Sequence, residues 1–242
     1  MMIRLQGVSC MYEGVPALRE VDLEISRGDA VALIGPNGSG KSTLLKLLNG
    51  LLFPVDGCYH FDGQRITAAA LKDDLFARRF HQRIGFLFQN PDTQLFCPSV
   101  QEEVAFGPRQ MDLDDDEVGR RTGECLDLLG IAHLCQRAPW HLSGGEKRLA
   151  ALSSVLALNP EVLTLDEPMN GLDPRTKRFL RQFLLEMRSA GKTIICATHD
   201  FIYIRDVFPT AVVISADHRV ARTGSFSQIV EDTAFLEEHN LV

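Results

Sequence analysis

One eight-residue run constrains this chain more than any other feature. It matches the pattern G-x-x-x-x-G-K-[ST] and reads Gly35-Pro36-Asn37-Gly38-Ser39-Gly40-Lys41-Ser42. The apolar run from Ala30 to Ile34 precedes it, and the helix-like segment from Thr43 to Leu52 follows it. A buried strand, a glycine loop and a helix in this order predict a phosphate-binding loop. The competing interpretation is an ordinary glycine-rich turn between a strand and a helix.

Each residue type in this loop has a physical reason. Glycines let the backbone N–H groups point inward at phosphate oxygens, and the helix N-terminus adds a partial positive charge. Lys41 is expected to lie against the β- and γ-phosphates, and Ser42 to offer its hydroxyl to Mg²⁺.

Two acidic residues follow a second buried run. Val162 to Leu165 is apolar apart from one Thr, and Asp166 and Glu167 come directly after it. Open α/β sheets present their ligands at such strand ends. Asp166 suits a direct or indirect role at Mg²⁺, and Glu167 is placed to polarise an attacking water. The alternative is that both acids merely cap the next helix.

A third element reads Leu142-Ser143-Gly144-Gly145-Glu146. Ser143 and Glu146 have the spacing of a capping box, and capping alone explains both residues. It does not explain the two glycines, which are poor helix formers but leave N–H groups at the helix start accessible to an anion. A phosphate supplied from elsewhere would fit there.

The remaining pattern predicts an α/β fold. Val21, Leu23 and Ile25 alternate with polar residues, and Asp62-Gly63 is typical of a hairpin turn, so an antiparallel sheet is expected near the N-terminus. Buried-strand runs with helical patterns between them, notably Arg175 to Ser189, predict a mainly parallel sheet covered on both faces. These later runs are Val162 to Leu165, Thr193 to Ala197 and Ala211 to Ile214.

Buried-strand patterns vanish between about Asn90 and Trp140, which indicates a helical insert. The stretch from Asp114 to Leu129 has apolar residues at approximate helical spacing. They are Val118, Cys125, Leu126, Leu128 and Leu129. The acidic run from Asp112 to Glu117 is expected to form the first turn, where negative charge meets the helix dipole, and a special acidic binding site is the alternative.

The composition of the chain limits the kinds of partner that it can bind. The chain has 25 Lys and Arg against 32 Asp and Glu, a net charge of −7, which argues against nucleic acid and against broad binding to anionic membranes. Its 6 cysteines form no C-x-x-C pair and are expected to be reduced thiols of a cytosolic protein. Its apolar stretches fall short of the roughly 20 residues that span a bilayer, so a role at a membrane would need a partner.

Taken together, five motifs closely resemble those of the ATP-binding-cassette (ABC) ATPases. In order they are the Walker A motif at Gly35 to Ser42, the signature at Leu142 to Glu146, the Walker B motif at Leu163 to Pro168, the D-loop at Gly171 to Pro174 and the switch histidine at Thr198 to Asp200. The signature separates this family from other P-loop proteins. The resemblance implies one ATP-binding domain over residues 1–242: a P-loop ATPase core, an N-terminal antiparallel β-subdomain and a helical subdomain at about 90–160.

The family also implies ATP and Mg²⁺ as ligands. The residues implied to bind ATP are Tyr12, which would stack on adenine, Gly35, Pro36, Asn37, Gly38, Ser39, Gly40, Lys41, Ser42, Thr43, Ser143, Gly144, Gly145, Glu146 and Asp173. Those implied at Mg²⁺ are Ser42, Gln89 and Asp166, and those implied in catalysis are Glu167, Gln89 and His199. On residues alone, the commoner roles are a half-buried strand residue for Tyr12 and a loop histidine for His199. In this family, the Lys41 loop of one subunit and Ser143 of a second close on a shared ATP.

A finer resemblance follows Gln89. The run from Phe88 to Phe96, with Val100 and the run from Glu103 to Pro108, is similar to the cassettes of energy-coupling-factor importers and of cobalt and nickel importers. It implies an ATPase held at the cytoplasmic face of the membrane by a transmembrane coupling subunit and a substrate-binding membrane subunit. Cobalt or nickel is the expected cargo, and biotin or another vitamin the alternative.

Two features depart from this subgroup. Met169 stands where a small hydroxyl residue is commoner, and the sequence stops at Val242 where many members continue. The second leaves a homodimer and a heterodimer both open. A rival function is a cytosolic cassette without transport, such as an iron–sulfur assembly scaffold, and only the segment 88–108 speaks against it. A regulatory cassette that does not hydrolyse ATP is disfavoured by Glu167.

Overall fold

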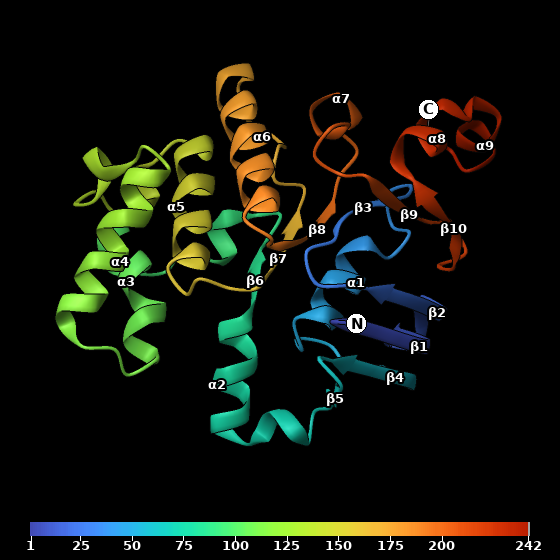
Figure 1. Cartoon of the computed structure of the whole chain (residues 1–242), viewed down its shortest axis with the longest axis horizontal. Coiled ribbons are helices and arrows are strands. Elements are labelled where there is room, and N and C mark those ends of the chain that lie inside the picture. Colours follow the sequence, from blue (N-terminus) through green and yellow to red (C-terminus); the bar gives the residue numbers. More distant parts are fainter. Residues whose placement is uncertain (242) are drawn as a thin grey trace.

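Two β-sheets position the phosphate loop (Figure 1). In the computed structural model, which describes residues 1–241, a four-stranded antiparallel sheet has the order β2-β1-β4-β5 and a six-stranded sheet the order β10-β9-β3-β8-β7-β6. The strands are β1 (Ile3–Tyr12), β2 (Val15–Ile25), β3 (Ala30–Ile34), β4 (Asp56–Phe61), β5 (Gln64–Arg65), β6 (Ile84–Leu87), β7 (Val162–Asp166), β8 (Thr193–Ala197), β9 (Thr210–Ile214) and β10 (Val220–Ser225).

Helices cover both faces of the larger sheet. The α-helices are α1 (Lys41–Leu48), α2 (Asp74–Arg83), α3 (Val100–Gln110), α4 (Asp115–Leu128), α5 (Gly144–Leu156), α6 (Pro174–Ser189), α7 (Phe201–Ile204), α8 (Phe226–Glu231) and α9 (Thr233–Glu238). Short 3-10 helices are η1 (Ala70–Lys72), η2 (Pro91–Thr93), η3 (Ala132–Leu134) and η4 (Pro139–His141). In Figure 1, α3, α4 and α5 lie together to one side of the sheets.

Strand β3 shows why the larger sheet is buried on both faces. Val31 and Leu33 pack in a cluster with α1 and the antiparallel sheet, whereas Ala30, Ala32 and Ile34 pack in a second cluster with α5, α6 and α8. Alternate side chains of a strand point to opposite faces, so a continuous apolar run suits a doubly covered strand. The predicted parallel sheet is confirmed: β6, β7, β8, β3 and β9 are parallel, and β10 pairs antiparallel with β9.

The N-terminal antiparallel sheet is confirmed as well. Val21, Leu23 and Ile25 are buried on β2, which pairs antiparallel with β1. The predicted turn at Asp62-Gly63 joins β4 to β5, with Phe61 opposite Gln64.

Two helix predictions need correction. The helix after the loop ends at Leu48 rather than Leu52, because Asn49 caps it and Gly50 adopts a left-handed φ of +67°. In α4, which Asp114 caps as the acidic run predicted, Leu128 is exposed while its neighbours on the inner face are buried. A 3.6-residue period that brings 125, 126 and 129 to the core turns 128 toward solvent.

Strand register brings the chemically interesting loops to one edge. Asp166 at the end of β7 lies opposite Ala197 at the end of β8, and Ala197 lies opposite Leu33 near the end of β3. The loops that follow these parallel strands therefore converge at the carboxyl edge of the sheet. All six cysteines are free thiols in this fold. No helix among residues 1–241 is both long and apolar enough to cross a membrane.

Candidate functional site

The loop after β3 wraps so tightly that two of its glycines are required by space. A Cβ on Gly35 would come within 2.3 Å of the Ile214 carbonyl oxygen, and a Cβ on Gly40 within 2.3 Å of the Ala17 carbonyl oxygen. Gly40 also has a φ of +112°, which side chains disfavour. The loop is thus a folded cradle at the start of α1, as a phosphate site requires, rather than a loose turn.

Lys41 provides the positive charge of this cradle. Its Nζ donates to the carbonyl oxygens of Gly35 at 2.7 Å and Pro36 at 3.0 Å. Burial lowers the pKa of the Lys41 ammonium, and the carboxylates of Glu167 and Asp166 oppose that shift. An anion entering the cradle would supply a charged partner where only neutral carbonyls now accept.

A single cavity of about 200 Å³ unites the predicted phosphate and metal residues. Its lining comes from three segments that the sheet brings together: the glycine loop with the start of α1, the loop after β6, and the end of β7 with the residue that follows it. The lining residues are Asn37, Gly38, Ser39, Gly40, Lys41, Ser42, Thr43, Gln89, Asp166 and Glu167. The structure therefore places all three predicted Mg²⁺ residues and two of the three predicted catalytic residues around one space.

Asp166, the last residue of β7, is buried. Burial raises the pKa of its carboxyl group, while the Ser42 hydroxyl, as hydrogen-bond donor, lowers it. No cluster of three or more His, Cys, Asp or Glu side chains suited to a metal occurs among the described residues. One carboxylate with a hydroxyl and an amide oxygen nevertheless fits Mg²⁺, which keeps several waters and takes few protein ligands beside phosphates.

Glu167 has a constrained main chain and a defined side-chain partner. Its φ is +48°, uncommon for a residue with a side chain, and its N–H donates to the Ala197 carbonyl at 2.8 Å. Its Oε2 lies 2.9 Å from Nδ1 of the exposed His199. The loops after β7 and β8 thus bring the predicted base and the predicted switch histidine into contact.

The helix-capping interpretation of Asp166 and Glu167 is wrong, because Asp173 caps the next helix. The Asp173 carboxylate accepts from the backbone N–H groups of Arg175 at 2.8 Å and Thr176 at 3.1 Å, at the start of α6. The two acids at the end of β7 are free to face the cavity.

Ser143 and Glu146 form the predicted capping box at the start of α5. The Ser143 N–H donates to Glu146 Oε2 at 2.7 Å, and the Glu146 N–H donates to Ser143 Oγ at 3.4 Å. A Cβ on Gly144 would meet no atom within 4 Å, so this helix start is open. None of the four residues from Ser143 to Glu146 lines the cavity that holds Lys41.

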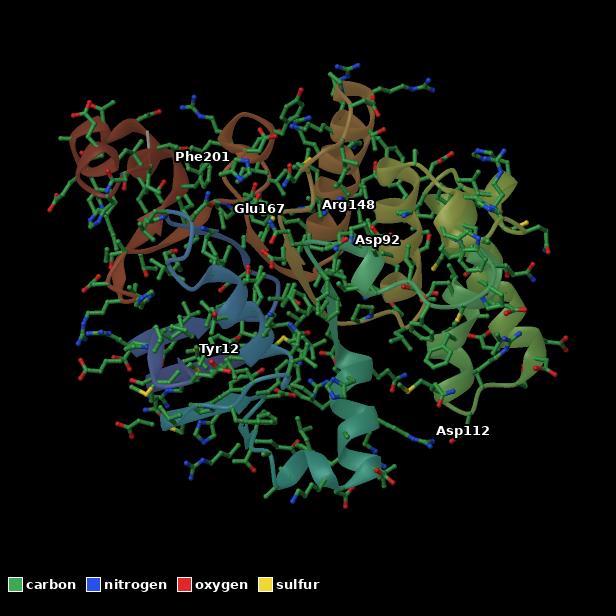
Figure 2. The ribbon with its side chains drawn as sticks, turned by 180° about the vertical axis from the view of Figure 1, so that it is seen from behind. Tyr12, Asp92, Asp112, Arg148, Glu167 and Phe201 are labelled. Carbon is green, nitrogen blue, oxygen red and sulfur yellow. The ribbon has the colours of Figure 1, made fainter. Side chains whose placement is uncertain are left out.

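Tyr12 also lies outside that cavity. It ends β1, is 43% exposed, and Figure 2 places it on the antiparallel sheet, away from Glu167. Tyr12 thus lies on a strand and is a little over half buried, which is also what the alternative of a half-buried strand residue predicts.

Sequence patterns did not single out Arg148, which the structure connects to the site. It lies on α5, is buried, and reaches the main chain beside two predicted catalytic residues (Figure 2). The sequence did contain a signal for it: Arg148 stands at a position of the helix that faces the core. Arg is rarely buried unless it is paired.

Comparisons with known proteins show what this chain is similar to. A family model described as "ABC transporter" matches residues 18–170. A putative ABC transporter ATP-binding protein of Clostridium acetobutylicum is 53% identical over 241 residues, 100% of both chains. The nickel import ATP-binding protein LarO of Lactiplantibacillus plantarum is 47% identical over 219 residues, 90% of this chain and 91% of LarO. The structure of cbiO1 from Clostridium perfringens, described as part of the ABC transporter complex cbiONQ, superposes with a TM-score of 0.82 and 34% identity, over 99% of this chain and 94% of that one.

Proposed function

This chain belongs to the ABC transporter family of ATPase subunits, and we propose that it drives a membrane importer of the energy-coupling-factor type for nickel or cobalt ions. The named relatives support the cargo, since LarO is a nickel import protein and cbiO1 is part of cbiONQ. One observation carries the transport role: exposed aromatic side chains line a groove that is formed partly by the segment after Gln89. A partner bound in this groove would contact the chain next to the Gln89 loop, where it could sense the nucleotide.

The residues that line the 200 Å³ cavity have different roles in ATP hydrolysis. Lys41 and the loop N–H groups hold the phosphates, and Ser42, Asp166 and Gln89 would hold Mg²⁺. When bound, Mg²⁺ neutralises charge that develops on the phosphate oxygens. Glu167 accepts a proton from water as the water oxygen bonds to the γ-phosphorus and the bond to the ADP oxygen breaks. His199, in contact with Glu167, orients that carboxylate.

The site is proposed to be completed by a second subunit. Ser143 and the glycines beside it present an open helix start but do not line their own subunit's cavity. A helix N-terminus attracts anions, so the γ-phosphate of an ATP on the partner suits this position. Asp173, already bound to the N–H groups of α6, would lie at the same interface in the family's arrangement.

The Tyr12 ring gives a first prediction, adenine stacking. Stacking of an aromatic ring on a base contributes about 1 to 3 kcal/mol and tolerates any purine. Tyr12→Ala should therefore weaken the binding of ATP and GTP alike, by about 5- to 150-fold, with kcat little changed. Equilibrium binding of both nucleotides to the purified chain measures this, and Tyr12→Phe is the matched control. Unchanged nucleotide affinity in Tyr12→Ala would show that Tyr12 is only a surface residue of β1.

The exposed groove is built from the segment 94–108 and its neighbours. Phe96 is 66% exposed and packs edge-on against the exposed Phe106, with ring centroids 5.0 Å apart. Both rings border a cavity of about 260 Å³ that also meets the exposed Leu51. Val100 and Val104, from the same segment, are buried in the core. Exposed apolar side chains that gather in a groove usually mark an interaction site, and an apolar helix of a transmembrane partner suits this one.

Phe96→Asp tests this docking role. It places a charge in the groove, so copurification with the membrane subunits and ion uptake should fall by about tenfold or more. ATP hydrolysis by the isolated chain should persist. Leu128→Asp, at an exposed apolar position of α4 outside the groove, is the matched control and should assemble normally. If Phe96→Asp assembles and transports as the wild type does, the docking role is wrong and a soluble scaffold becomes the better function.

The cargo is tested on the intact complex. Copurification of this chain with its transmembrane coupling and substrate-binding subunits, at the cytoplasmic face of the membrane, should yield bound nickel or cobalt by elemental analysis. A bound vitamin in place of the metal would keep the importer and change its cargo.

A further inference from the structure

Arg148 is a buried cation that the roles assigned so far do not use. Its side chain comes from α5, the helix that Ser143 caps, and the residue is only 7% exposed. Its hydrogen-bond partners among the described residues are main-chain carbonyls rather than a carboxylate. Its Nε is buried and has no partner within the described chain. Burying a guanidinium with incomplete pairing is unfavourable, so stability alone does not account for this residue.

The two carbonyls that Arg148 contacts belong to catalytic residues. One terminal nitrogen donates to the Glu167 carbonyl at 3.0 Å, and the other donates to the Gln89 carbonyl at 2.9 Å. These residues come from the loops after different strands, β7 and β6, which are neighbours in the sheet. A planar guanidinium can hold two acceptors in a fixed relation, which a flexible ammonium does less well.

The contact matters most at Glu167, whose backbone is strained. A φ of +48° persists only where surrounding contacts hold it. The Glu167 peptide is held by its own N–H to Ala197, by Asn170 N–H to its carbonyl at 3.1 Å, and by Arg148. Arg148 is the one of these three contacts that comes from α5.

The same stretch of α5 is attached to the segment after Gln89. Lys147 Nζ lies 2.6 Å from Asp92 Oδ1 on η2, and Figure 2 shows Arg148 between Glu167 and Asp92. This exposed pair is weak by itself, but together with the buried bond from Arg148 to the Gln89 carbonyl it links α5 to the Gln89 loop, and the bond from Arg148 to Glu167 extends that linkage to the end of β7.

We propose that Arg148 is a positioning residue for ATP hydrolysis. From α5 it holds the main chain of Glu167 and Gln89, so that movement of Ser143 toward the ATP of the partner subunit is transmitted to the water-activating carboxylate of its own subunit. Each of the two ATP sites in a dimer thereby senses closure at the other. The inference rests on the proposed function and adds the coupling between its two sites.

Arg148→Met tests the inference, because Met fills similar volume without charge or donors. We expect kcat of the purified full chain to fall by at least about fivefold, with ATP affinity within about threefold of the wild type. ATP-dependent association should persist, since the phosphate loop and Ser143 are unchanged. Arg148→Lys, which retains the charge and one or more donors, should fold and recover part of the lost kcat.

Arg188→Met is the matched control. Arg188 likewise donates to two main-chain carbonyls, of Asp206 at 3.2 Å and Val207 at 3.1 Å, but outside the cavity. It should leave kcat unchanged. The positioning role is overturned if kcat of Arg148→Met falls by less than about fivefold, or if kcat of Arg188→Met falls as much. It is also overturned if Arg148→Met loses ATP affinity in parallel with kcat. If Arg148→Met does not fold, the Lys variant decides, and a kcat equal to that of the wild type overturns the role.

Wild type and Glu167→Gln are measured alongside. If the wild type does not hydrolyse ATP, or Glu167→Gln hydrolyses it normally, the proposed function fails. If Glu167 is essential and Arg148→Met turns over normally, only the coupling through Arg148 fails.

Discussion

Glu167→Gln is expected to lower ATP turnover by about a hundredfold or more while ATP binding is retained. The amide has nearly the shape of the carboxylate but cannot accept the proton of the attacking water. Because the γ-phosphate then stays in place, the ATP-dependent dimer should persist instead of dissociating after hydrolysis. Steady-state phosphate release measures the first effect, and size-exclusion chromatography with ATP and Mg²⁺ measures the second.

Glu186→Gln is the matched control for that experiment. Glu186 lies on α6, where it accepts from Gln182 at 3.0 Å, outside the cavity. The same chemical change there should leave turnover unaltered. Near-normal turnover in Glu167→Gln would show that Glu167 is not the base, although it lines the cavity and contacts His199.

Strands β3, β7, β8 and β9 and the loop were predictable because their signals are local. A continuous apolar run followed by a glycine pattern predicts β3, the loop and α1, and β8 begins and ends as its apolar run predicts. The end of α1 has a local signal too, which the sequence prediction missed: Asn49-Gly50 is typical of a helix end, and Gly50 adopts a φ of +67°. The packing around Gly50 is long-range, since a Cβ there would meet the Leu71 side chain at 2.5 Å, and a local pattern does not contain that contact.

The site shows the same division between local and long-range information. Lys41, Ser42 and Asp166 could be predicted, since each follows a buried run in a motif with its own chemistry. The contact between Glu167 and His199 needed the register of β7 and β8, and the reach of Arg148 to Glu167 and Gln89 needed the packing of α5. Side-chain reach across tertiary contacts is not encoded in spacing along the chain.

Ser143→Asp is expected to abolish ATP-dependent dimerisation while leaving the fold intact, and this separates the two roles of Ser143. Asp is as good an N-cap as Ser for the Glu146 N–H, but it cannot donate to Glu146 Oε2 as the Ser143 hydroxyl does at 2.7 Å. The loss of stability should therefore stay within the about 0.5 to 2 kcal/mol that removal of a cap causes, which is a fraction of the stability of a typical domain. A carboxylate facing the γ-phosphate of a partner's ATP would instead repel it.

Lys41→Ala should also prevent dimerisation, by loss of ATP binding in its own loop. Mixing the two variants places one intact composite site in each mixed dimer, whereas neither variant alone has any, so ATP-dependent association should return on mixing. Ser99→Asp, the same change at the N-cap of α3, is the matched control and should dimerise normally. If Ser143→Asp dimerises with ATP as the wild type does, the capping box accounts for Ser143 and the second half of the site must lie elsewhere.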